Sequence, residues 1–172
     1  MIYFKSSLKK FLRKVALFFF TIADLLTPKN EQIIIFCQAR GRYNGNSRAL
    51  FEYMVNNESF EVYWITPSSD VADNIRSSFQ LAPLMSMYSI GGYLKILRAR
   101  TFVISHGMSD FYDYSKPSYR KKIVNVWHGI ALKKYGVLDE KYNYNEALRL
   151  RNKYWGKYSL VLSASDSDRY IA

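Results

Sequence analysis

The chain has 172 residues, of which 49% are hydrophobic and 17% aromatic. This composition excludes a disordered protein and is sufficient for one domain with its own core. The net charge of +11 indicates an anionic partner, for which nucleic acid, an anionic membrane and a phosphate-rich substrate are the candidate classes. The single cysteine, Cys37, excludes an internal disulfide, and its apolar surroundings predict a buried thiol in the core.

Residues 1–30 differ from the rest of the chain, because basic residues fill the gaps between apolar residues that recur at helical spacing. Three structures fit this pattern: a helix lying on an anionic membrane surface, a spanning or signal-like segment, and a helix packed on its own domain. The apolar run is shorter than the roughly 20 residues that span a bilayer, and it contains Asp24. No small-residue cleavage motif precedes Pro28. We therefore predict a basic amphipathic helix at the membrane surface, followed by a domain over residues 31–172.

From residue 31 onward, apolar strands alternate with helical segments. Continuous apolar runs are typical of strands that are buried on both faces of a sheet. Strands are predicted at 32–37, 61–66, 84–87, 100–105, 121–127 and 159–163, and helices at 47–55, 70–79, 90–98 and 145–154. Ser47 is the expected cap of the first of these helices. The alternation predicts an α/β fold, with a Rossmann-like parallel sheet and helices on both of its faces.

The two histidines of the chain, His106 and His128, each follow a predicted strand and precede a glycine. Ligands bind outside the carboxyl ends of parallel strands, so both side chains are expected at the edge of the sheet that forms sites. A strand-ending histidine can also simply cap the sheet, and this alternative stays open. A metal site is disfavoured, because two histidines and one remote cysteine make a poor ligand set. A neutral imidazole suits a base that takes a proton from an attacking alcohol.

The segment after the second histidine is expected to bind phosphate. A helix that starts near Ile130 would direct its free N–H groups toward the same edge, and Lys133 and Lys134 add positive charge. The glycine of each His-Gly pair lets a substrate approach the backbone closely. The candidate substrate- and phosphate-binding residues are therefore Gly129, Lys133, Lys134 and His106.

Other motifs indicate no different chemistry. Asp110 and Asp113 are interpreted as loop residues in preference to a base or an orienting group. Residues 41–45 lack the glycine spacing of a dinucleotide-binding loop, and no Walker A motif occurs. No RNP-type aromatic pattern or helix-turn-helix supports the binding of nucleic acid.

The run from Lys121 to Gly136, KKIVNVWHGIALKKYG, resembles the Trp-His-Gly-Thr-Pro-Leu-Lys-x-x-Gly motif of CDP-glycerol glycerophosphotransferases. These are the primases and polymerases of teichoic acid synthesis, and related capsule and ribitol-phosphate transferases share the motif. The Trp-His-Gly and Leu-Lys portions match, whereas Ile130 and Ala131 stand where Thr and Pro are usual. The strand, loop and helix opening around Asn46 is also similar.

The resemblance implies the N-terminal, acceptor-side half of a GT-B glycosyltransferase fold, with His128 as the catalytic base. It implies transfer of polyol phosphate from CDP-glycerol or CDP-ribitol to a hydroxyl of a polyol-phosphate polymer, with no cofactor and no nucleic acid. The family works at the cytoplasmic face of the bacterial membrane, in agreement with the predicted peripheral helix. Because the chain ends shortly after the last predicted strand, we expect a truncated protein that lacks the donor domain and is inactive alone.

Two other functions stay open at this point. The first is a non-catalytic module at the membrane surface that binds anionic polymer through the same positive charge. The second is a fragment of a GT-B glycosyltransferase that uses a sugar nucleotide.

Overall fold

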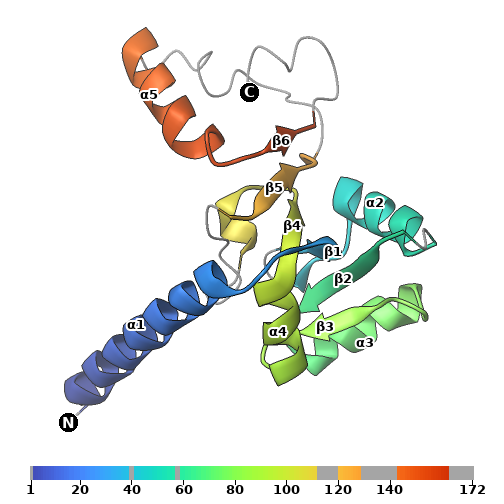
Figure 1. Ribbon diagram of the computed structural model, residues 1–172, viewed down its shortest axis with the longest axis horizontal. Helices are drawn as coiled ribbons and strands as arrows, with labels where there is room; N and C mark the ends of the chain where they lie inside the picture. The colour runs from blue at the N-terminus through green and yellow to red at the C-terminus, as the bar shows by residue number, and fades with distance from the viewer. Residues whose placement is uncertain (1, 39–40, 57–58, 112–119, 129–142, 163–172) are drawn as a thin grey trace.

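The computed structural model describes residues 2–38, 41–56, 59–111, 120–128 and 143–162. Within them, six parallel strands form one sheet in the order β3-β2-β1-β4-β5-β6 (Figure 1). The strands are β1 (Asn30–Phe36), β2 (Glu61–Thr66), β3 (Leu84–Ser86), β4 (Ala99–Ile104), β5 (Lys122–Asn125) and β6 (Leu160–Val161). The helices are α1 (Ile2–Leu26), α2 (Gly45–Val55), α3 (Ser69–Ser78), α4 (Ile90–Arg98) and α5 (Tyr144–Trp155), with a 3₁₀ turn η2 (Met108–Asp110).

Alternate residues of the central strand β1 point to opposite faces of the sheet, and each face has its own core. On the face covered by α2 and α3, Ile34 and Phe36 belong to one buried cluster. Phe36 stacks on Trp64 with ring centroids 5.8 Å apart and meets Phe51 edge-on at 5.2 Å. Helices therefore cover both faces of a parallel sheet, and the predicted α/β, Rossmann-like fold is confirmed.

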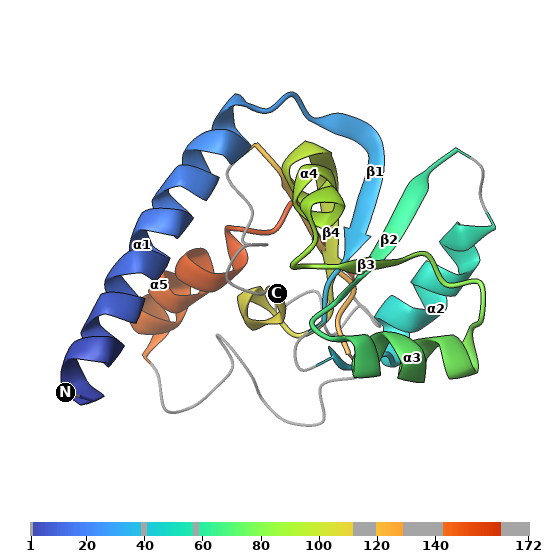
Figure 2. The ribbon, with the colours of Figure 1, turned by 90° about the horizontal axis from the view of Figure 1, so that it is seen from below.

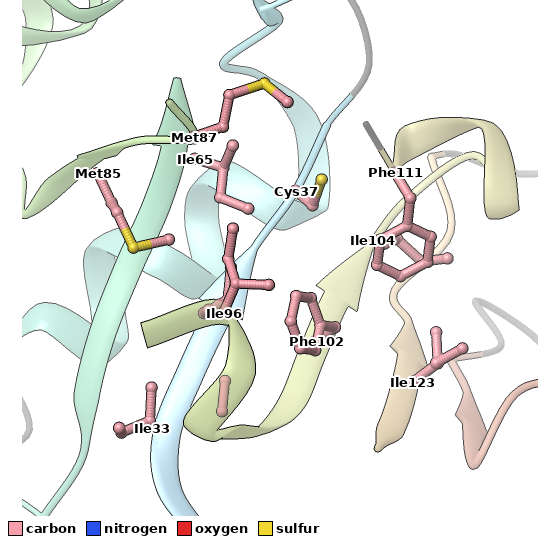
Figure 3. Packing of buried hydrophobic residues seen from close by; sticks show 12 residues of the cluster. Ile33, Cys37, Ile65, Met85, Met87, Ile96, Phe102, Ile104, Phe111 and Ile123 are labelled. Carbon is pink, nitrogen blue, oxygen red and sulfur yellow. The ribbon is translucent and has the colours of Figure 1, made fainter. Parts of the chain in front are cut away.

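Figure 3 shows the core on the other face, where Ile33 and Cys37 of the β1 segment meet Ile96 of α4. Phe102 of β4 extends this cluster toward Phe111, with ring centroids 5.7 Å apart. Cys37 is fully buried, as predicted for a thiol in the core.

The start of α2 differs from the prediction, because Ser47 does not cap it. The helix begins at Gly45 after Asn44, and Ser47 is a buried residue of its first turn. The side chain of Asn44 makes no capping bond, since its Oδ1 accepts a hydrogen bond from Gln38 at 3.0 Å. The expected helix near Ile130 and the helix opening at 166–172 lie outside the described residues.

Helix α1 is attached to the domain through its C-terminal part. Asp24 is 1% exposed and pairs with two buried lysines, at 2.9 Å from Lys29 Nζ and 2.6 Å from Lys121 Nζ. One turn earlier, the ring of Phe20 meets that of Tyr93 on α4, with centroids 6.3 Å apart. The N-terminal part of α1 projects away from the sheet in both views (Figures 1 and 2).

The projecting helix carries an exposed apolar stripe. It consists of six residues that are between 38% and 76% exposed: Phe11, Leu12, Phe18, Phe19, Ile22 and Leu26. At about 100° per residue, these side chains fall within an arc of about 120°. Phe20 and Asp24, which contact the domain, lie on the other side of the helix. Among the described residues, no helix has the length and apolar character that a membrane span requires.

Alanine substitutions at two adjacent glycines in the first turn of α4 are expected to have opposite effects on the free energy of unfolding. A Cβ at Gly92 would lie 2.1 Å from the carbonyl oxygen of Ser86, whereas a Cβ at Gly91 would meet nothing within 4 Å. Gly92→Ala is therefore expected to lower the free energy of unfolding by about 1–3 kcal/mol. Gly91→Ala is expected to raise it by about 0.4–1 kcal/mol, because alanine restricts the unfolded chain. Urea unfolding of both variants checks this, and equal effects would contradict the close packing at Gly92.

Candidate functional site

The direction in which the chain adds strands to the sheet reverses between β1 and β4, so these two strands flank the switch point. The chain winds from β1 through β2 to β3 on one side, and from β4 through β5 to β6 on the other. Ligands of open parallel sheets bind outside the strand ends at such a switch point. The polar residues that follow the strands at this edge include Gln38 after β1, His106 after β4 and His128 after β5.

The sheet brings the two histidines into direct contact. The rings of His106 and His128 stack with centroids 4.5 Å apart and planes inclined by 21°. The ring of His128 also stacks against Trp127, at 4.7 Å and 18°. Both histidines are partly open to solvent, with the side chain of His106 31% exposed. The pair is therefore accessible to a substrate at the expected edge of the sheet.

A buried carboxylate lies behind His106. Asp110 is 0% exposed, and its Oδ2 accepts hydrogen bonds from the backbone N–H groups of Ser105 and His106, at 2.8 and 2.7 Å. Its Oδ1 lies 3.6 Å from His106 Nδ1. The turn that returns Asp110 to the strand end requires a glycine, because Gly107 has a φ of 144°. Asp110 lies in the turn η2 between β4 and β5, as interpreted from the sequence, but it is buried there against the end of β4. Asp113 lies outside the described residues.

The backbone turns sharply just before His128. Trp127 has a φ of 56°, a left-handed conformation that costs a bulky residue about 1–3 kcal/mol. Its N–H donates to Asn125 Oδ1 at 2.9 Å, and Asn46 Nδ2 on α2 donates to the carbonyl of Val126 at 2.9 Å. These two hydrogen bonds hold the strained turn that carries the ring of His128 onto that of His106.

The segment between β1 and α2 adds a cation to the pair. Arg42 is exposed, and one of its terminal nitrogens lies 3.5 Å from His106 Nε2. The amide of Gln38 anchors this segment, because it donates to Asn44 Oδ1 at 3.0 Å and to Ser105 Oγ at 3.2 Å. That same hydroxyl lies 2.9 Å from His106 Nδ1. Hydrogen bonds therefore connect β1, α2 and the end of β4 around one imidazole.

Burial lowers the pKa of His106 below its ordinary value. The carboxylate of Asp110 acts in the opposite direction, and nearby His128 and Arg42 lower the pKa further. The net direction is downward, so His106 is neutral at pH 7. The site thus places an uncharged imidazole beside the ring of His128.

The site contains one residue that the sequence alone did not single out, namely Arg42. Asp110 was considered but not expected next to His106, and Trp127 was noted only as part of the Trp-His-Gly run. The available signal for Asp110 was its place four residues after a strand-ending histidine, but nothing in the spacing places Arg42 there. Of the predicted substrate-binding residues, the structure describes His106. Gly129, Lys133 and Lys134 lie outside the described residues.

A parallel sheet in this strand order, with polar side chains gathered outside its switch point, defines a Rossmann-like domain, and domains of this class generally bind ligands at the carboxyl edge. The model of one protein family, described as CDP-Glycerol:Poly(glycerophosphate) glycerophosphotransferase, matches residues 18–172. The chain therefore belongs to this family of transferases, as the run around His128 predicted.

Known relatives agree with this assignment. The chain is 27% identical over 136 residues to a teichoic acid glycerol-phosphate transferase of Staphylococcus aureus (strain NCTC 8325 / PS 47), covering 77% of this chain and 32% of that protein. Its fold is similar to that of the wall teichoic acid polymerase TagF, with a TM-score of 0.60 at 16% identity, over 98% of this chain and 42% of TagF. A TagF variant gives a TM-score of 0.62 at 15% identity, with the same coverage. The chain thus spans about a third of the curated relative and less than half of TagF.

Proposed function

We propose that this chain forms the acceptor side of a transferase that moves glycerol phosphate or ribitol phosphate from a CDP donor to a hydroxyl of a polyol-phosphate polymer. The observation that carries the proposal is the stacked pair of His106 and His128 at the carboxyl edge of the sheet, in a chain of this family. The donor nucleotide is proposed to bind to a second domain, and the relatives are long enough to contain one, since this chain spans 32% of the curated relative and 42% of TagF.

In the proposed reaction, His128 takes the proton from the polymer hydroxyl as its oxygen attacks the β-phosphorus of the CDP donor. A new O–P bond forms, the bond between the β-phosphorus and the bridging oxygen breaks, and CMP leaves. The products are the polymer extended by one polyol phosphate, CMP and a proton held on His128. Lys133, Lys134 and Gly129 are proposed to contact the phosphates, as their positions after the histidine suggest.

The proposal is tested by joining the chain to the remainder of the Staphylococcus aureus relative and supplying labelled CDP-glycerol with a polymer acceptor. We expect the fused protein to incorporate label and the chain alone to incorporate none. CDP-ribitol and UDP-sugars, supplied in parallel, distinguish the donor classes. A stable fused protein that is inactive with every donor would contradict the proposed transfer and favour a non-catalytic polymer-binding module.

We propose further that α1 lies on the anionic, cytoplasmic face of the bacterial membrane as a peripheral anchor. The apolar stripe of α1 supports this, because it faces away from the attachment at Asp24 and has the width of an interfacial helix. The sequence places five basic residues between positions 5 and 14 of the same helix, and the chain carries a net charge of +11. An anionic lipid surface complements both properties.

Substitutions within the apolar stripe test the anchor better than deletion of residues 1–30, because deletion would also remove the buried Asp24. Phe18→Gln with Phe19→Gln is expected to reduce co-sedimentation with vesicles of anionic lipid at least tenfold, since two exposed rings lose their apolar contact with the acyl boundary. Leu81→Gln is the matched control, because Leu81 is 83% exposed and lies in the segment between α3 and β3, and these two elements lie far from α1 in both views (Figures 1 and 2). Equal sedimentation of both variants would contradict the anchor.

A further inference from the structure

The surroundings of His106 specify where its proton lies. Arg42 reaches His106 Nε2 at 3.5 Å with a guanidinium nitrogen, and a guanidinium has hydrogen-bond donors but no acceptor. Nε2 must therefore present a lone pair. On the other side of the ring, Nδ1 faces Ser105 Oγ at 2.9 Å and Asp110 Oδ1 at 3.6 Å, and both oxygens can accept. The contacts fit a neutral imidazole with its proton on Nδ1, the tautomer that a free histidine disfavours.

A second proton on His106 would conflict with the groups around it. Its new N–H would point at the Arg42 guanidinium, and its charge would lie against the ring of His128. Asp110 from η2 is the opposing charge, but its Oδ2 already accepts two backbone N–H groups. Among the described residues, Tyr158, whose hydroxyl lies near Gly107, is a further titratable group on this side. Burial of the ring acts in the same direction as Arg42 and keeps the pKa of His106 low.

A neutral ring at this position has a consequence for His128. An aromatic face attracts a cation that lies over it, whereas two stacked imidazolium rings would repel each other. The ring of His128 contacts His106 at 4.5 Å and Trp127 at 4.7 Å, so a positive charge formed on His128 during a reaction would lie against two aromatic ring faces. That charge is the one that forms when His128 takes a proton.

We propose that His106 is a positioning residue for His128: Arg42 and Asp110 hold it neutral with its proton on Nδ1, and its ring face orients His128 and stabilises the imidazolium formed there. The catalytic part of this proposal, the stabilisation of the His128 imidazolium during transfer, rests on the proposed function. The tautomer and the stacking are properties of the folded chain and are testable without it.

Imidazole nitrogen NMR of the whole chain in detergent micelles tests the tautomer directly. The chain has two histidines, so its spectrum contains two imidazole spin systems, and His106→Phe assigns them. At pH 7 we expect His106 to show a protonated Nδ1 and an unprotonated Nε2. A proton on Nε2, alone or together with one on Nδ1, would overturn the proposal.

Two arginine variants test how the tautomer is maintained. Arg42→Gln removes the cation that faces Nε2, so we expect part of the His106 population to move its proton to Nε2 and the ring to titrate at a higher pH. Arg48→Gln is the matched control, because Arg48 lies on the adjacent helix and pairs with Glu52 at 2.8 Å, away from His106. An unchanged His106 spectrum in Arg42→Gln, or equal changes in both variants, would overturn the role of Arg42.

The fused enzyme described above tests the effect on catalysis. His106→Ala is expected to reduce incorporation about 10- to 100-fold through misplacement of His128. His106→Phe restores a ring face, so we expect it to recover much of that loss, and it should retain the ring-current shift of the His128 protons that His106→Ala loses. Full activity in His106→Ala, or no recovery in His106→Phe, would overturn the proposal. An inactive unsubstituted enzyme would refute the proposed function but leave the NMR result to decide the tautomer.

Discussion

Replacing Asp24 by alanine is expected to lower the free energy of unfolding by about 3–5 kcal/mol, because it leaves two buried ammonium groups without a counter-charge. The side chains of Lys29 and Lys121 are 4% and 0% exposed, and both lie within 2.9 Å of Asp24 Oδ1. Urea unfolding at pH 7, followed by the fluorescence of the buried Trp64, measures the change. Asp73→Ala is the control, since Asp73 forms an exposed pair with Arg76 and its loss should cost at most about 0.5 kcal/mol.

The two lysines are not equivalent partners of Asp24, and a second variant shows why. Burial lowers the pKa of Lys121 to about 8, with the hydrogen bond and charge of Asp24 acting against this. Lys121→Met should therefore cost less than about 1.5 kcal/mol, because it removes a desolvated charge and leaves Asp24 paired with Lys29. A loss as large as that in Asp24→Ala would contradict this explanation of the cluster.

The same cluster predicts a dependence of stability on pH. Between pH 8 and the ordinary pKa of 10.5, the unfolded chain binds the Lys121 proton more tightly than the folded protein does. The contribution of Lys121 to the free energy of unfolding therefore rises with pH through this window. The rise should be absent in Lys121→Met when unfolding curves of the two proteins are compared at pH 8 and pH 10.

Replacing His128 by alanine in the fused enzyme is expected to lower the rate of polyol-phosphate incorporation about 100- to 10,000-fold, the usual contribution of a positioned base. His128 is exposed at the end of β5, so the folded chain should keep its urea midpoint. Lys122→Ala is the matched control, because Lys122 is an exposed residue at the opposite end of the same strand and pairs with Glu31 at 3.4 Å. Incorporation within tenfold of the unsubstituted enzyme would exclude His128 as the base.

The fold was predictable because its strands are locally encoded. The run from Ile33 to Cys37 is apolar at every position, and this pattern arises when both faces of a strand are covered. The strand–His–Gly junctions likewise placed His106 and His128 at one edge, since parallel strands share the direction in which they end. These local patterns were sufficient to predict the parallel sheet and the positions of His106 and His128 at its carboxyl edge.

The remainder of the site depends on contacts that have no local pattern. Arg42 and His106 are far apart in sequence and meet because β1 and β4 are adjacent in the sheet. Asp110 is polar and lies three residues after a glycine, in a segment whose composition matches that of a surface loop, yet it is buried and accepts hydrogen bonds from two backbone N–H groups. Trp127 has a left-handed backbone conformation, which bulky residues rarely adopt, so no sequence pattern predicts it.

The attachment of α1 also has a mechanical consequence. Lys29 and Lys121, which hold Asp24, immediately precede β1 and β5, and their ammonium groups also donate to the carbonyls of Leu97 and Ile96, just ahead of β4. These are the three strands whose opposite ends carry Gln38, His106 and His128. A force applied to α1 therefore acts on the near ends of the strands that carry the site. The buried cluster that holds α1 and the histidine pair therefore lie at opposite ends of the same three parallel strands, β1, β4 and β5.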